Sequence, residues 1–174
     1  MRFAYYQRLS AAQKAVYRRS DAIVAVPLPD AGSLQRLIPE IGSALVDEAP
    51  TAIQKACQRL ADDLLSQLGA PAVQTMVLEV RPSDTQGELH GLYEPSDPPY
   101  RSRITLWMRT AQREQVVAFR SFMRTLLHEL LHHLDYEIFD LAESFHTQGF
   151  YKRESSLFHQ LVPPDAATKG LAHK

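Results

Sequence analysis

Two histidines and a glutamate lie at a spacing that suits metal chemistry. In the segment His128-Glu-Leu-Leu-His132 the histidines are four residues apart. On an α-helix such residues are offset by about 40° around the axis, so both imidazoles project from one side, one turn apart. This arrangement suits two nitrogen ligands on one tetrahedral zinc ion. Glu129 points sideways, where it can take a proton from a water on the metal and hand it to a leaving amine.

A third protein ligand would complete such a site and leave one position open for water. His146 follows His132 by 14 residues, beyond the expected end of the helix and just before the next one. A residue there can fold back over the two histidines. Two glutamates compete for this role, Glu143 in the same linker and Glu154 on the following helix. We favour His146 and keep the glutamates as alternatives.

Several neighbouring side chains have two interpretations. Asp135 lies one helical turn beyond the histidines and either accepts an imidazole N–H or is a plain surface carboxylate. His133 faces away from the motif and is expected to be structural or exposed. Tyr93, Tyr136 and Tyr151 are candidate hydrogen-bond donors to a developing oxyanion, although each is more often a packing residue.

The elements that must position these residues can be predicted from hydrophobic periodicity. The motif lies in a long helix expected over residues 111–139, whose apolar side chains form one arc while the histidines lie outside it. Three helices are expected before it, at residues 10–19, 34–45 and 50–68, and one after it, at 148–161. Strands are expected at 73–81, 88–94 and 103–108. The order of helices, strands and helices predicts an α+β fold with a small mixed sheet of about three strands packed against helices.

Composition narrows the function classes. The 174 residues suit one domain, residues 1–162, followed by a polar tail at 163–174 that we expect to be disordered. The single cysteine, Cys57, lies on an apolar helical stripe and excludes a disulfide framework or a cysteine-rich zinc site. The N-terminus has no apolar signal region, no stretch is long enough to span a membrane, and a cytoplasmic location is the default expectation.

The residues from His128 onward resemble a known family. The motif HELLH followed by His146-Thr-Gln-Gly-Phe150 is similar to the SprT-like branch of zincin metallopeptidases and to other minimal zincins. The resemblance covers residues 72–161 as a catalytic core and leaves the N-terminal helices, 10–68, outside. It implies a zincin-like fold and one zinc per chain, held by His128, His132 and His146, with Glu129 as catalytic base. It also implies that Phe150 packs behind the third ligand, and that strand 103–108 is the sheet edge where an extended peptide pairs.

We therefore expect a zinc metallopeptidase that hydrolyses peptide bonds, and two other functions stay open. One is a zinc-binding regulatory or interaction module with little turnover. The other is a DNA-associated protease, because residues 101–124 carry a charge of +5 against −5 for residues 125–146. The net charge of −1 favours a solvated, salt-bridged surface over a nucleic-acid interface for this arginine run.

Overall fold

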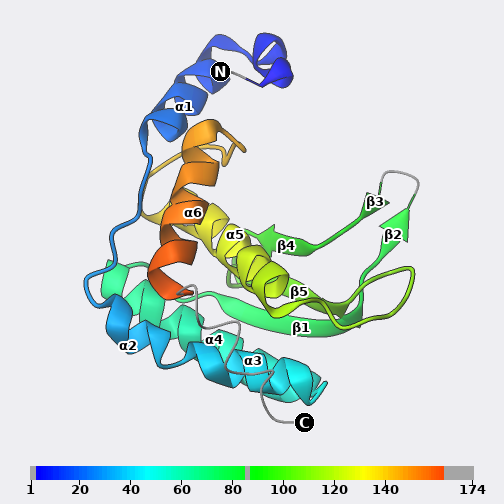
Figure 1. Ribbon diagram of the computed structural model, residues 1–174. Helices are drawn as coiled ribbons and strands as arrows, with labels where there is room; N and C mark the ends of the chain where they lie inside the picture. Colours follow the sequence, from blue (N-terminus) through cyan, green and yellow to red (C-terminus); the bar gives the residue numbers. More distant parts are fainter. Residues whose placement is uncertain (1–2, 85–86, 163–174) are drawn as a thin grey trace.

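A computed structural model describes residues 3–84 and 87–162 and shows a mixed α+β architecture (Figure 1). Its main sheet has the strand order β1-β5-β4. Strand β1 (Gln74–Val80) runs parallel to β5 (Arg103–Arg109), and β4 (Gly91–Glu94) runs antiparallel to β5. The predicted α+β class and the small three-stranded mixed sheet are confirmed. The tail at 163–174 lies outside the described residues.

The N-terminal third of the chain is helical, as predicted. A 3₁₀ helix, η1 (Ala4–Arg8), precedes α1 (Ala11–Ala22), α2 (Ala31–Gln35), α3 (Ile38–Val46) and α4 (Pro50–Leu68). Helix α1 starts with a capping box, in which Ser10 Oγ accepts from the Gln13 backbone N–H and the Gln13 side chain accepts from that of Ser10. Helix α4 ends at Gly69, whose φ of 70° is readily adopted only by glycine. The single helix expected over 34–45 is wrong, because the chain turns between α2 and α3.

Helix α4 covers the outer edge of β1. The Gln58 side chain accepts from the Thr75 backbone N–H (2.7 Å) and donates to the Val73 carbonyl (2.9 Å). The Gln54 side chain accepts from the Val77 N–H in the same way (3.1 Å). These glutamines satisfy backbone groups that an edge strand would otherwise leave unpaired. The other outer strand of the sheet is β4.

The expectation that residues 103–108 form the edge beside the site is therefore wrong. Strand β5 pairs on both sides and is the central strand. Its residues Ile104–Met108 are all buried, as is usual for a strand covered on both faces. The edge strand near the site is β4, which lies within the strand predicted at 88–94. Glu88, at the start of that stretch, instead belongs to β3 (Gly87–Glu88), which pairs with β2 (Ser83–Asp84) in a separate two-stranded arm.

Helix α5 (Phe119–Glu137) crosses the sheet and carries the HExxH motif. It is shorter than the predicted helix, because residues 110–118 fold back on β5. Thr110 N–H donates to the Gln115 carbonyl and Val117 N–H to that of Met108, while Glu114 has a φ of 50°. Leucines of α5 share one hydrophobic core with α4 and with apolar residues of β1 and β5. A loop then leads to α6 (Gln148–Leu161), the last predicted helix.

None of the helices among the described residues is long and apolar enough to cross a membrane.

Candidate metal centre

Three imidazoles converge at one point above α5. His128 and His132 extend from α5, and His146 reaches them from the loop before α6. Their Nε2 atoms are separated by 2.9 Å (His128–His146), 3.1 Å (His132–His146) and 3.3 Å (His128–His132). Nitrogens about 2.0–2.1 Å from a tetrahedral zinc lie about 3.3 Å apart, so this set of donors fits one such ion.

The remaining ring nitrogens fix which tautomers are present. His128 Nδ1 lies 3.0 Å from a carboxylate oxygen of Glu154, which only accepts, so this nitrogen carries the proton. His132 Nδ1 lies 2.7 Å from Ser144 Oγ, which itself donates to Asp135 (2.7 Å) and thus accepts from the imidazole. Two Nε2 lone pairs therefore face each other. A cation between them removes the repulsion, so the residues fit a bound metal.

Burial favours the neutral, metal-binding form of His132 and His146. Burial, with the positive charges of His128 and His146, lowers the pKa of His132 to about 3. Burial lowers the pKa of His146 as well, helped by His128 and opposed by Glu154. Neutral imidazoles near pH 7 have a lone pair free for coordination.

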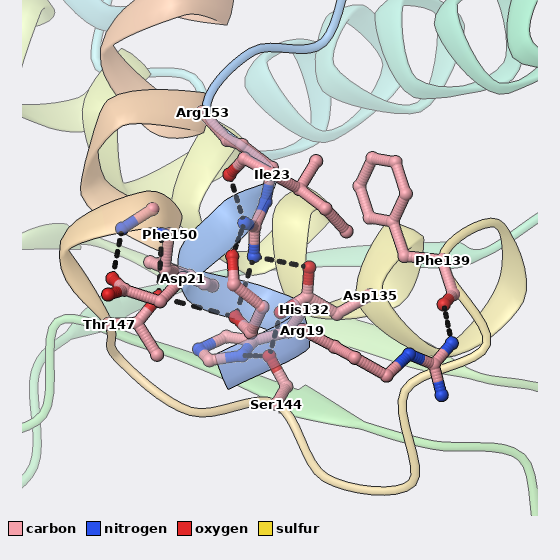
Figure 2. A network of polar contacts seen from close by, with 12 residues as sticks. Arg19, Asp21, Ile23, His132, Asp135, Phe139, Ser144, Thr147, Phe150 and Arg153 are labelled. Carbon is pink, nitrogen blue, oxygen red and sulfur yellow. Dashed lines mark hydrogen bonds and ion pairs between the residues drawn. The ribbon is translucent and has the colours of Figure 1, made fainter. Parts of the chain in front are cut away.

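Asp135 is one member of a buried polar network behind His132 (Figure 2). It forms an ion pair with Arg153 of α6 at 2.8 Å, and both side chains are fully buried. The alternative of a surface carboxylate is therefore wrong. Asp135 reaches the imidazole through Ser144, and Arg153 continues the network to the carbonyls of Ser20 and Ile23.

Glu129 lies beside the histidines in a pocket of about 330 Å³, which it lines together with Gly91, Tyr93 and Tyr136. Its side chain is buried, and burial raises the pKa of its carboxyl to about 7, against the opposing effects of His128 and the Tyr93 backbone N–H. Gly91 of β4 allows this close approach. A Cβ at residue 91 would lie 2.6 Å from Glu129 Oε1 and 2.7 Å from Thr125.

Phe150 forms the floor under all three imidazoles. Its ring centroid lies 4.9 Å from those of His128 and His132 and 5.0 Å from that of His146. Phe150 is fully buried at the start of α6, where Thr147 caps the helix by accepting from the Phe150 N–H. Phe150 was expected to pack behind the third ligand, His146. In the structure it packs against all three imidazoles.

The two glutamates considered as alternative ligands make other contacts. Glu154 binds the outer nitrogen of His128 and forms an ion pair with Arg124 at 3.4 Å. Glu143 accepts a hydrogen bond from Gln13 of α1 at 3.2 Å. The structure brings His146 Nε2 next to the Nε2 atoms of His128 and His132, whereas Glu154 contacts His128 Nδ1, on the opposite side of that ring.

The tyrosines separate into different roles. Tyr93 donates its hydroxyl hydrogen to His133 Nδ1 (3.1 Å), because His133 Nε2 donates to the Pro71 carbonyl (2.8 Å). His133 is thus buried and structural, and the alternative that it is exposed is wrong. Tyr136 stacks on Tyr93 with 5.9 Å between centroids and lines the pocket, while Tyr151 stacks on His146 at the same distance. Tyr136 and Tyr151 stay candidates for the oxyanion donor.

Several arginines of the run at 101–124 are paired with acidic or aromatic side chains. Arg103 forms an ion pair with Glu94, Arg109 with Glu48 and Arg124 with Glu154. Arg120 and Arg124 also lie over the Phe158 ring, at 4.8 and 4.0 Å from its centroid. These contacts favour the salt-bridged interpretation of the run over a nucleic-acid surface.

Comparison of the chain with protein-family models, curated proteins and solved structures found no match. The assignment of a function therefore depends on the geometry of this site.

Sequence reasoning missed Ser144, Arg153 and Gly91. Arg153 left a detectable signal, because it interrupts an apolar stripe on α6 formed by Phe150, Leu157 and Leu161. An arginine at such a position must find a buried partner. Ser144 and Gly91 carry no comparable pattern, since their roles arise only when the loop and β4 are brought onto α5.

Proposed function

We propose that this chain is a zinc-dependent metallopeptidase with a zincin-like, SprT-like core, which hydrolyses peptide bonds. One zinc per chain would be held by His128, His132 and His146. The observation that carries the proposal is the convergence of three Nε2 atoms, two of them with lone pairs fixed by Glu154 and Ser144, beside a buried glutamate. When bound, the zinc would polarise a scissile carbonyl and acidify a water.

Glu129 is the proposed general base. Its carboxylate lines the same pocket as the histidines, and a pKa near 7 suits proton transfer close to neutral pH. It would accept a proton from the attacking water and return it to the leaving amine. The buried position supplies the raised pKa, and Gly91 leaves the space that the carboxylate occupies.

Strand β4 is the proposed platform for the substrate. It is an outer strand of the sheet, and its residues Gly91, Leu92 and Tyr93 line the pocket. An extended peptide paired with this strand would run past Glu129 and the histidines. An open pocket that contains a buried carboxylate favours an enzyme over a zinc-binding module with little turnover.

Substituting Glu129 by Gln tests the proposal. We expect E129Q to keep one zinc per chain, measured by elemental mass spectrometry, and to lose hydrolysis of unfolded casein and of a peptide library by about 10²- to 10⁴-fold. Wild-type protein treated with a chelator provides the control for metal dependence. Undiminished hydrolysis by E129Q, or by chelated wild type, would refute the mechanism.

A further inference from the structure

The third imidazole of the triad comes from a loop that has little regular structure of its own. Residues 138–147, all of them described, form neither helix nor strand. His146 lies near the end of this loop, whereas His128 and His132 are fixed by a helix. A metal site is only as well formed as its least rigid ligand. Something outside the loop must therefore hold His146 in place.

The first α-helix and the segment before it bind along this loop. We call residues 5–21 the N-terminal clamp. Tyr5 Oη donates to the His146 carbonyl at 3.0 Å, and Arg19 donates to the Phe139 carbonyl at 3.1 Å. Gln13 donates to the Glu143 side chain at 3.2 Å. The contacts thus begin just after α5 and extend to His146 itself.

The end of the clamp also fixes the first turn of α6. Asp21 Oδ1 accepts from the Gly149 N–H at 3.0 Å, and the hydroxyls of Ser20 and Thr147 lie 3.3 Å apart (Figure 2). The backbones are so close that a Cβ at residue 149 would lie 2.5 Å from the carbonyl oxygens of both Ser20 and Asp21. Gly149 is what permits this approach.

The clamp contacts the loop and α6, where its Ser20 also accepts from the buried Arg153, and it lies outside the main hydrophobic core. Of the described residues, none between 3 and 22 belongs to the main hydrophobic core. Figure 1 shows α1 beside the start of α6 and away from the sheet. The buried clamp residues Tyr6 of η1 and Tyr17 of α1 pack in an aromatic group with Tyr5 and Phe145. The clamp therefore covers the ligand loop and contributes little to the main core.

We infer that the N-terminal clamp is a positioning element of the metal centre, which sets zinc affinity by holding His146 against His128 and His132. This inference depends on the proposed zinc site. It assigns a role to a part of the chain that lies outside the family resemblance. It also makes Tyr5, Asp21 and Gly149 positioning residues, although none of them would touch the metal.

The test uses Gly149→Ala in the full-length protein. The added methyl group forces α1 away from α6, while alanine is a better helix former than glycine, so α6 itself is not weakened. Gly42→Ala is the matched control, because a Cβ there would meet only the Phe119 ring at 3.6 Å, an ordinary contact. Zinc affinity is measured by competition with a chelator. Hydrogen exchange of residues 138–147 is measured in the metal-free protein.

We expect G149A to speed hydrogen exchange in the loop and to weaken zinc binding by about 10- to 100-fold, with G42A close to wild type. Combining G149A with His146→Ala separates positioning from general damage. If the clamp acts through His146, H146A and the double variant should bind zinc equally. A loss of affinity that persists in the H146A background would overturn the inference.

Other outcomes separate this inference from the proposed function. Normal zinc affinity in G149A, with zinc bound by wild type, would overturn the clamp alone. Absence of zinc from wild type would overturn the zinc site and the clamp's role together. Should G149A fail to fold, Tyr5→Phe removes only the hydroxyl on the His146 carbonyl. It should weaken zinc binding without lowering the free energy of unfolding of the metal-free protein by more than about 1.5 kcal/mol. Unchanged zinc affinity in this variant would then overturn the clamp, because Tyr5 makes its direct contact with His146.

Discussion

Each imidazole of the helix pair is oriented by a different partner. Glu154 holds the outer nitrogen of His128, and Ser144, backed by Asp135, holds that of His132. These contacts fix the tautomers and aim both Nε2 lone pairs inward. Such outer contacts commonly change metal affinity by 10- to 100-fold when they are removed.

Glu154 therefore gives a sharp test, because it was also an alternative ligand. We expect Glu154→Ala to weaken zinc binding by about 10- to 100-fold, since His128 loses its acceptor. Glu154→Gln retains a carbonyl oxygen that accepts the Nδ1 hydrogen, so most of the affinity should return. Competition with a chelator measures both variants. If the Gln variant is as weak as the Ala variant, Glu154 acts through its charge or as a ligand, and not as an acceptor.

Glu129 should make the metal-free protein less stable as pH rises. Burial raises the pKa of its carboxyl from 4.5 to about 7, so the folded chain keeps a proton that the unfolded chain has already lost. Stability falls between these pH values, and the cost reaches about 3 kcal/mol above pH 7. In a chelating buffer, the free energy of unfolding of E129Q, measured by urea denaturation, should be higher than that of wild type by up to this amount at pH 8. At pH 4 the two values should be equal. An equal difference at both pH values would contradict the raised pKa.

Among the elements, β4 is the one that completes the pocket. It brings Gly91 against Glu129 and Tyr93 against the histidine side of α5. It is also the outer strand opposite β1, whose own outer edge is covered by α4 through Gln54 and Gln58. Position 91 of β4 thus controls where the Glu129 carboxylate lies.

Gly91→Ala should affect catalysis more than metal binding. The new methyl group would occupy the space of the Glu129 carboxylate and displace it, and a shift of about 1 Å in a catalytic group costs about 10²-fold. We expect kcat/KM for peptide hydrolysis to fall by at least this factor with one zinc still bound. Gly32→Ala is the control, since the nearest atom there is a flexible Asp30 oxygen at 3.4 Å. Full activity in G91A would show that Glu129 tolerates displacement or is not the base.

Local sequence patterns predicted the elements better than their arrangement. The capping box at Ser10 and the glycine at 69 mark helix ends that the structure confirms. The predicted start of the long helix at residue 111 was wrong, because Val116 and Val117 pair with β5 and residues before Phe119 are not helical. Which strand lies at the edge depends on pairing between distant segments, which periodicity along one segment does not encode. The spacing of HExxH placed His128 and His132 on one face, but the contacts of Ser144 and Arg153 arise only from the loop and α6.

The molecule as a whole divides into a hydrophobic core that supports the site and an N-terminal clamp that holds its loop. The core joins α3, α4 and α5 to the sheet and includes Cys57, which is fully buried. The clamp is attached through polar contacts and a separate aromatic group. The site lies between these two parts.

Cys57 should report on unfolding of the core. Burial raises the pKa of its thiol far above the usual range, so the reactive thiolate is scarce while the core is intact. We expect a thiol reagent to label Cys57 only as fast as the core unfolds, with the urea midpoint of labelling equal to that of circular dichroism. G149A should leave this midpoint near that of G42A. Rapid labelling of the native protein would contradict the buried position.

Metal content tests the central claim most directly. The purified protein, reconstituted with zinc and freed of excess metal, should contain one zinc per chain by elemental mass spectrometry. His146→Ala should bind that zinc much more weakly, while His159→Ala, an exposed histidine on α6, should bind it like wild type. Absence of zinc from wild type, or unchanged zinc binding in H146A, would contradict the assignment of this site.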